Sequence, residues 1–260
     1  MKLKDNKASV FELKQADSPL VISVPHDGAL IPEVIQKTMH DYALDTPDRD
    51  TGIAQVFEFE ALKYSKIKAN FSRYVVDLNR PAAGGALYAG QNETTVCPTT
   101  LFDERPIYLD GKEPNAEEVA QRVETYWRPY HDQLQALIDQ AKAKFGYCLL
   151  IDAHSIDAVV PRFFEGRLSD ISVGTYDGNS CGNELQEALS SALQKQKDYS
   201  HVINDRFKGG FITRHYGQPQ ANIHAIQLEH VKDVYAGKGC IELMQFWQHV
   251  IGLLLKQLKA

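Results

Sequence analysis

Four segments that the sequence predicts to be strands end in side chains that can do chemistry. They end in His26 after LVISVP, in Asn79 and Arg80 of RYVVDLNR, in His154 after YCLLIDA, and in Glu229 after IHAIQL. Functional groups of open α/β sheets gather at the carboxyl ends of strands, so we expect these side chains to share one site. The alternative is a set of unrelated strand ends, because polar residues also appear wherever a strand leaves the core.

The two histidines indicate a metal site. Neutral imidazole is the commonest metal ligand in proteins, and a catalytic zinc ion typically has three protein ligands and one open position. No HExxH motif is present, so a third ligand must come from elsewhere, and the acids of TPDRDTG, Asp48 and Asp50, are the candidates. The alternative role for either acid is to cap the helix that we expect to begin directly after them.

Two further acids lie next to these candidates. Asp152 precedes His154 by two positions, so the two side chains leave the same face of a strand, and Asp152 could orient the imidazole. Glu229 could act as a general base beside a metal-bound water. The alternatives are an exposed Asp–His pair in a loop and an ordinary surface glutamate at a strand end.

Arginines outside the expected helices suggest an anionic substrate. Arg73, Arg80, Arg162 and Arg214 are predicted to lie in loops or at strand ends of an acidic chain. Arginine binds carboxylates through two parallel hydrogen bonds, so several of them near a metal favour a substrate with one or more carboxylates. Any one of them could instead be a solvated surface charge.

The elements that must position these residues alternate between strands and helices. Helices are expected over 52–65, over 115–145, over 183–196 after an Asn179–Ser180 cap, and over 241–258. In the second helix we expect Asn115 to be the N-cap, Pro129 to cause a kink and Gly146 to end the helix. Strands are expected over 20–26 and 147–154, in KIKANF, RYVVDLNR, HVIND and IHAIQLE, and an aperiodic loop over 81–111. This alternation predicts an α/β domain with a parallel or mixed sheet.

Composition and charge exclude several classes of protein. The chain has 260 residues, a net charge of −6 and a pI near 5.8, which argues against general nucleic-acid binding. The four cysteines form no CxxC pair, the first 15 residues have no apolar core of signal-peptide length, and no apolar stretch approaches the length of a membrane span. We therefore expect a cytoplasmic protein without nucleic-acid or membrane partners.

The motifs then resemble those of the N-formylglutamate amidohydrolase (deformylase) family, a distant relative of zinc carboxypeptidases and aspartoacylase. The resemblance runs in order from about Leu20 to the last helix, through SVPHDG, DRDTG, SRYVVDLNRP, LYAGQNETTVCPTTLFDERPIY, WRPYH, IDAHSI, VPRFFEGRLSD, GTYDGNSC, RFKGGFITRHYGQP and IHAIQLE. It implies one α/β domain over residues 1–260, of phosphorylase/hydrolase-like or zinc-carboxypeptidase-like architecture, with a mixed central sheet and helices on both faces. The implied activity is hydrolysis of N-formyl-L-glutamate to formate and L-glutamate in histidine degradation.

The resemblance also implies roles for individual residues. His26 and His154 match the metal histidines. The relatives take another ligand from HxxE, where this chain has HDGA, so Asp50 is our replacement and Asp48 the second choice. Glu229 matches the general base, and Arg73 matches an arginine that polarises the scissile carbonyl.

The remaining roles concern the substrate. Asn79 and Arg80 match a pair that holds the substrate α-carboxylate, and Arg214 is the candidate for the side-chain carboxylate. Tyr216 and Arg162 are looser candidates for substrate binding. We expect one divalent ion, zinc, and a small substrate with two carboxylates, whose formyl group is selected because a bulkier acyl group would meet the loop after Pro81.

Two other functions remain open from the sequence. A related zinc amidohydrolase acting on another N-acyl amino acid would use the same residues with a different pocket. A protein of another class, which binds amino-acid ligands without a metal, would not need both histidines and Glu229. The sequence makes no prediction of the oligomeric state.

Overall fold

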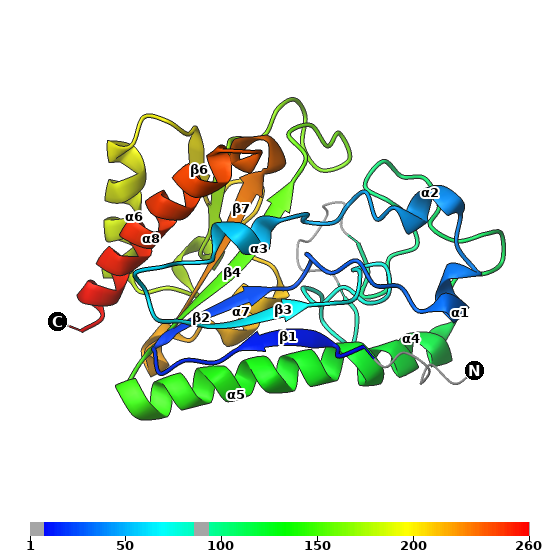
Figure 1. The fold of residues 1–260 in the computed structure, drawn as a ribbon, viewed down its shortest axis with the longest axis horizontal. Coiled ribbons are helices and arrows are strands. Elements are labelled where there is room, and N and C mark those ends of the chain that lie inside the picture. Colours follow the sequence, from blue (N-terminus) through cyan, green and yellow to red (C-terminus); the bar gives the residue numbers. More distant parts are fainter. Residues whose placement is uncertain (1–7, 86–93, 260) are drawn as a thin grey trace.

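The computed structural model describes residues 8–85 and 94–259, and in these ranges a seven-stranded mixed sheet forms the centre of the protein (Figure 1). The strand order is β1-β3-β2-β4-β7-β5-β6. The strands are β1 (Phe11–Lys14), β2 (Leu20–Val24), β3 (Ser65–Ala69), β4 (Cys148–Ile156), β5 (Ile171–Gly174), β6 (His201–Ile203) and β7 (Ile223–Val231). The β1–β3 and β5–β7 pairs are antiparallel and the other pairs are parallel.

Helices cover both faces of this sheet, as the family resemblance implies. The α-helices are α1 (Glu33–Gln36), α2 (Asp41–Leu44), α3 (Ile53–Val56), α4 (Ala116–Arg122), α5 (Arg128–Phe145), α6 (Asn183–Lys195), α7 (Phe211–Tyr216) and α8 (Gly239–Gln257). Short 3-10 turns cover Tyr176–Gly178, Pro219–Ala221 and Lys232–Tyr235. Helix α5 lies along one face with α7, whereas α3, α6 and α8 lie on the other face (Figure 1).

The two faces of the sheet carry separate hydrophobic cores, and the period of two along β4 shows how they are divided. Cys148 and Leu150 face the α5 core, whereas Leu149 and Ile151 face the α8 core. Asp152 and His154 continue the first series, so they leave the sheet on the α5 side, beyond the end of its apolar core. The candidate site residues of β4 therefore lie directly beyond the hydrophobic core on the α5 side of the sheet.

Two predicted elements are wrong. The helix expected over 52–65 is only the four residues of α3. The RYVVDLNR segment is a series of turns and not a strand. Side chains cause these turns by bonding to backbone two residues on: Ser72 Oγ accepts from Tyr74 N, and Asp77 Oδ1 accepts from Asn79 N. Such local bonds offer the backbone an alternative to a strand.

The long helix predicted over 115–145 is present but interrupted. Asn115 caps it, accepting from the Glu118 amide, and Gly146 ends it in the left-handed conformation with φ of 81°. The irregularity predicted at Pro129 takes the form of a π-helical turn, Val123–Trp127, between α4 and α5. Proline has no N–H for the preceding turn, and the extra residue of a π turn accommodates such a gap.

The other predicted elements differ only at their ends. β4 and β7 continue two residues beyond His154 and Glu229, because the two strands stay paired as far as Ile156 and Val231. The Asn179–Ser180 cap is wrong, since α6 starts after Gly182 without a side-chain cap. Residues 86–93 of the predicted 81–111 loop lie outside the described residues.

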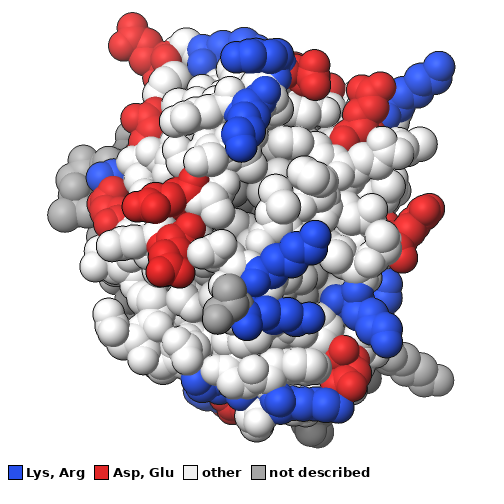
Figure 2. All heavy atoms as spheres, turned by 90° about the vertical axis from the view of Figure 1, so that its left-hand side faces the viewer, with Lys and Arg blue, Asp and Glu red and all other residues white. Residues whose placement is uncertain are grey.

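Two further features of the structure are the hydropathy of the helices and the distribution of charge on the surface. In the described ranges, none of the helices combines the length and the apolar character that a membrane crossing requires. Figure 2 shows the face that carries α6 and α8, where acidic and basic side chains are interspersed between large uncharged areas.

Candidate active site

The register of two central strands, β4 and β7, places several candidate site residues side by side. In the parallel pairing of β4 with β7, His154 lies directly beside Glu229, and Asp152 beside Gln227. His26 follows β2, the other neighbour of β4. The register therefore brings three of the predicted site residues together at one edge of the sheet, and all three line one pocket.

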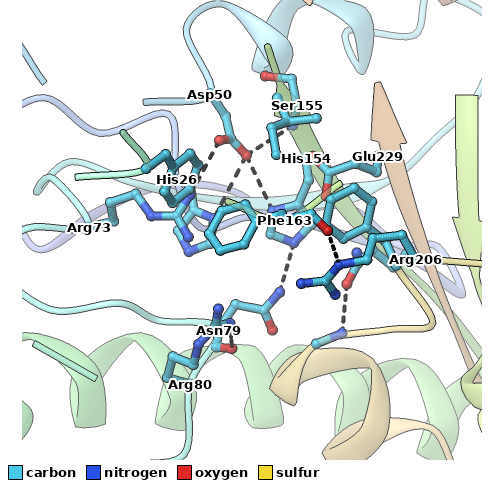
Figure 3. A pocket seen from close by; sticks show the side chains of 15 residues that line it. His26, Asp50, Arg73, Asn79, Arg80, His154, Ser155, Phe163, Arg206 and Glu229 are labelled. Atoms are coloured by element: carbon cyan, nitrogen blue, oxygen red, sulfur yellow. Dashed lines mark hydrogen bonds and ion pairs between the residues drawn. The ribbon is translucent and has the colours of Figure 1, made fainter. Parts of the chain in front are cut away.

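Asp50 completes a buried cluster with the two histidines (Figure 3). One ligand atom of each residue, from His26, Asp50 and His154, lies within 4.8 Å of the others. Asp50 Oδ2 is 3.2 Å from His154 Nδ1 and 3.8 Å from His26 Nδ1. The cluster offers two imidazole nitrogens and a carboxylate, a donor set that zinc accepts at catalytic sites.

Each histidine of this cluster is held from behind by its own carboxylate. His26 Nε2 is 2.8 Å from Asp77 Oδ1, and His154 Nε2 is 2.9 Å from Asp152 Oδ2. An Nε2–H that donates to a carboxylate leaves Nδ1 as the lone-pair nitrogen, which is how metal-binding histidines are oriented. His26 Nδ1 and Asp50 Oδ1 are buried atoms without a hydrogen-bond partner among the described residues, so the cluster fits a cation.

The HDG and DRDTG motifs fold together to place Asp50. Asp27 accepts from the Gly52 and Ala54 amides and pairs with Arg49 at 2.9 Å, so it, and neither of the predicted acids, holds the start of α3. The Asp50 amide donates to the His26 carbonyl. A side chain at Gly28 would meet the Phe71 carbonyl at 2.4 Å, which explains why the turn after His26 has a glycine.

The structure distinguishes between the two candidate acids. Asp48 accepts hydrogen bonds from the Tyr74 hydroxyl at 2.7 Å and from the Phe102 amide at 2.9 Å. It therefore has a structural role in joining two loops and is not part of the cluster. Asp50 is the acid that faces both histidines.

The charges around the cluster favour a cation between its members. Burial disfavours ionisation, but His154 and His26 outweigh it and lower the pKa of Asp50. Burial would lower the pKa of His154, yet Asp152, together with Asp50 and Glu229, raises it well above its usual range. This balance favours positive charge at His154 Nδ1, either as a proton or as a metal ion.

Glu229 has the properties of a base that can exchange protons near neutral pH. Burial raises its pKa to about 8, against the attraction of His154. A carboxylate whose pKa lies near the working pH can accept a proton and return it. Its position beside His154 puts it within the same pocket as the cluster.

Arg73 lies on the other side of the cluster, as Figure 3 shows. Its Nη2 pairs with Asp77 Oδ2 at 2.8 Å, and its Nη1 is 3.8 Å from Asp50 Oδ1. Asp77 thus binds His26 and Arg73 at once. No role was predicted for Asp77, although a second histidine ligand calls for a second orienting carboxylate.

Asn79 and Arg80 line the pocket, but the Asn79 side chain already has protein partners. Its Nδ2 donates to Asp152 Oδ2 at 3.2 Å and lies 3.0 Å from His154 Nε2, and its Oδ1 accepts from the Ile212 amide at 2.8 Å. Asn79 therefore holds Asp152 behind His154. Arg80 donates to the Thr94 and Asn79 carbonyls.

The WRPYH segment, at the junction of the π turn and α5, binds the backbone of this loop. Trp127 Nε1 donates to the Arg80 carbonyl, and His131 Nε2 donates to the Leu78 carbonyl, both at 2.9 Å. Trp127 and His131 are four residues apart, so they lie on one helix face. The π turn ends at Trp127, where this contact starts.

Three predicted substrate-binding residues are not part of the pocket lining. Arg214, which lies on α7 and not in a loop, donates to the Gly209 carbonyl and lies over the Tyr176 ring. The Tyr216 hydroxyl bonds to His131, and Arg162 bonds to Thr100 and the Leu101 carbonyl. The pocket contains instead an arginine that was not predicted from the sequence, Arg206, together with the rings of Phe102, Phe163 and Phe207.

Comparison with known proteins finds a matching family model and similar sequences over most of the chain. A family model described as "N-formylglutamate amidohydrolase" matches residues 18–236. Two proteins named "N-formylglutamate deformylase" are similar: one from Pseudomonas aeruginosa is 43% identical and covers 96% of both chains. One from Pseudomonas putida is 42% identical over 87% of this chain and 85% of its own.

Two solved structures share the fold. A crystal structure titled as N-formylglutamate amidohydrolase from Ralstonia eutropha JMP134 has a TM-score of 0.76 at 22% identity, covering 97% of this chain and 98% of that one. A gene product from Agrobacterium tumefaciens has a TM-score of 0.78 at 17% identity, covering 97% of each chain. The match of the family model and the two deformylases over most of their length show that this chain belongs to the N-formylglutamate amidohydrolase family.

Proposed function

We propose that this protein hydrolyses N-formyl-L-glutamate to formate and L-glutamate with one divalent metal ion, which we take to be zinc. The observation that carries the proposal is the buried cluster of His26, Asp50 and His154 beside Glu229, in a chain whose relatives are named N-formylglutamate deformylases. Two imidazoles and one carboxylate suit zinc better than magnesium or calcium, which prefer oxygen ligands.

The metal and the protein would divide the chemistry between them. A divalent ion in this cluster supplies positive charge that acidifies a water molecule and stabilises negative charge on a carbonyl oxygen. Glu229 would take the proton of the attacking water and later deliver it to the departing amine nitrogen. Hydrolysis of the formamide then balances as one water consumed, with formate and the free amine released.

The arginines would bind the charges of the substrate. Arg73 lines the pocket next to Asp50, where its guanidinium can stabilise the developing oxyanion of the formyl group. Arg80 lines the same pocket and, among the described residues, donates to the Thr94 and Asn79 carbonyls, so it is our candidate for the substrate α-carboxylate. We infer that Asn79 acts through Asp152 and not by direct contact with the substrate, because its amide group already bonds to Asp152 and Ile212.

Formate release from purified, zinc-loaded protein tests the proposal. We expect N-formyl-L-glutamate to be the best substrate in a panel of N-formyl and N-acetyl amino acids. Glu229→Gln should lower kcat by about a hundredfold or more, since a general base contributes at least that much. Glu187→Gln, an exposed change of the same kind on α6, is the matched control.

Each part of the proposal can fail separately. Preference for another N-acyl amino acid would replace the substrate and keep the amidohydrolase chemistry. A Glu229→Gln variant within a few-fold of the unsubstituted enzyme would exclude Glu229 as the base. A protein that binds no zinc and releases no formate would contradict the function as a whole.

A further inference from the structure

Arg206 is the pocket residue to which neither the sequence motifs nor the proposed mechanism gives a role. It lies in the loop between β6 and α7, and it lines the same pocket as His154 and Glu229. In Figure 3 its guanidinium points into the pocket from the side opposite Arg73, above Asn79 and Arg80. Three arginines therefore converge on one small site.

The three arginines differ in what already surrounds them. Arg73 is paired with Asp77 and lies near Asp50, so its charge belongs to the cluster. Arg80 is anchored next to Asn79, at the loop that α5 holds. Arg206 approaches from a different loop and a different wall, so it can meet a second anionic group of a substrate whose first carboxylate is at Arg80.

The protein fixes the direction of the Arg206 side chain. Its Nε donates to the Phe163 carbonyl at 2.7 Å, and its guanidinium carbon lies 5.6 Å and 5.4 Å from the ring centres of Phe163 and Phe207. Aromatic rings beside a guanidinium orient its plane and exclude water, which strengthens its attraction for a carboxylate. The geometry is that of a prepared anion site and not of a solvated surface charge.

The loop that carries Arg206 is also fixed. Asn204 Oδ1 accepts from the Thr175 amide, and the Gly210 amide donates to Gln227 Oε1. A side chain at Gly210 would lie 2.4 Å from Asn79 Nδ2, so the Arg206 loop and the Asn79–Arg80 loop are in close contact. The distance between the two arginine-bearing walls is therefore set by packing.

We propose that Arg206 is the specificity-determining residue of this site and binds the side-chain carboxylate of a dicarboxylic N-acyl amino acid. This inference rests on the proposed function and deepens it, and it replaces Arg214 in the role that the sequence predicts. A neutral side chain of the same size, such as that of glutamine, cannot form with Arg206 the charge-assisted, two-bond pair that a carboxylate forms. The enzyme discriminates against it for that reason.

The test compares Arg206→Met with the unsubstituted enzyme on N-formyl-L-glutamate and on N-formyl-L-glutamine. We expect kcat/KM for the glutamate substrate to fall about a hundredfold, and that for the glutamine substrate to change less than about threefold. Arg206→Lys keeps the charge without the planar fork and should retain part of the preference. Lys208→Met, on the same loop but paired with Asp177 at the surface, is the matched control and should change neither value.

Calorimetry of product binding separates this inference from the proposed function. Arg206→Met should weaken binding of L-glutamate and leave binding of L-glutamine unchanged, and this readout does not need catalysis. An equal loss on both ligands, or an unchanged preference for glutamate, overturns the role of Arg206. Collapse of the preference in Arg214→Met but not in Arg206→Met would return the role to Arg214. Absence of formate release with a normal Arg206-dependent preference for glutamate would instead contradict only the deformylase activity.

Discussion

Two pairs of fully buried histidines lie in this protein, and their partners differ. His26 and His154 each contact a carboxylate through Nε2, Asp77 and Asp152 respectively, and turn Nδ1 towards Asp50. His131 and His230 bond only to neutral groups in the described part of the chain.

The neutral pair is held at both ring nitrogens. His131 lies between the Leu78 carbonyl and the Tyr216 hydroxyl, and His230 lies between the His154 carbonyl and Trp247 Nε1. Burial lowers the pKa of His131 to about 3 and that of His230 to about 4, so both are neutral fixtures of the core. Burial alone therefore does not mark a ligand; a charged partner on one nitrogen and an open second nitrogen do.

The largest effect is expected when one histidine of each pair is replaced. His154→Ala should abolish stoichiometric zinc binding, because only two of the three protein ligands of a catalytic zinc site would remain. His131→Gln, which keeps a donor for the Leu78 carbonyl, should retain zinc. Elemental analysis after dialysis measures both. Full zinc occupancy in His154→Ala would move the metal site elsewhere.

A smaller change removes only the charge behind a ligand. Asp152→Asn keeps an acceptor for His154 Nε2 but removes the negative charge, and we expect zinc affinity to fall about 10- to 100-fold. Asp77→Asn should act in the same direction through His26. Competition with a chelator measures the affinity, and Asp132→Asn on the exposed face of α5 is the control. Unchanged zinc affinity in both variants would show that the negative charges of Asp152 and Asp77 do not contribute to metal binding.

The smallest effect is expected from the neutral pair, in the pH dependence of the free energy of unfolding. The pKa of His131 is about 3 in the fold, against an ordinary value of 6.5, so as pH falls below 6.5 the unfolded chain takes up a proton that the folded chain refuses. The contribution of His131 to the free energy of unfolding is therefore fully present above pH 6.5 and is lost as the pH falls towards 3. The loss from this group is about 1.4 kcal/mol at pH 5.5. His131→Gln should remove that part of the acid sensitivity in urea unfolding at pH 7.5 and 5.5. An identical decrease in both proteins would show that His131 can be protonated within the fold.

The sequence was sufficient to predict the fold class and the end of the sheet at which the site lies. The alternation of apolar runs and helical periodicity predicted a mixed α/β sheet, and polar residues at strand ends predicted that His26, His154 and Glu229 meet. The pattern succeeds because strand periodicity fixes which face a side chain leaves, and parallel strands end at the same edge. Asp152 was found for the same reason, since it lies two residues before His154 on one strand.

Tertiary structure alone decided the contacts that depend on loops. Local spacing could not separate Asp50 from Asp48, because Asp27, Tyr74 and the Phe102 amide, all distant in sequence, determine which acid turns towards the histidines. The turns of RYVVDLNR depend on side-chain bonds that compete with a strand.

Arg206 and Arg214 show the same limit within a single motif region. Both precede β7 in a segment that contains three glycines. Arg206 reaches the pocket because it bonds to the Phe163 carbonyl and because Gly210 of its loop packs against Asn79, whereas Arg214 lies over Tyr176. The sequence thus determined the elements and the residues on their faces, because periodicity is a local property. The choice among neighbouring loop residues was made only by contacts between segments far apart in the chain.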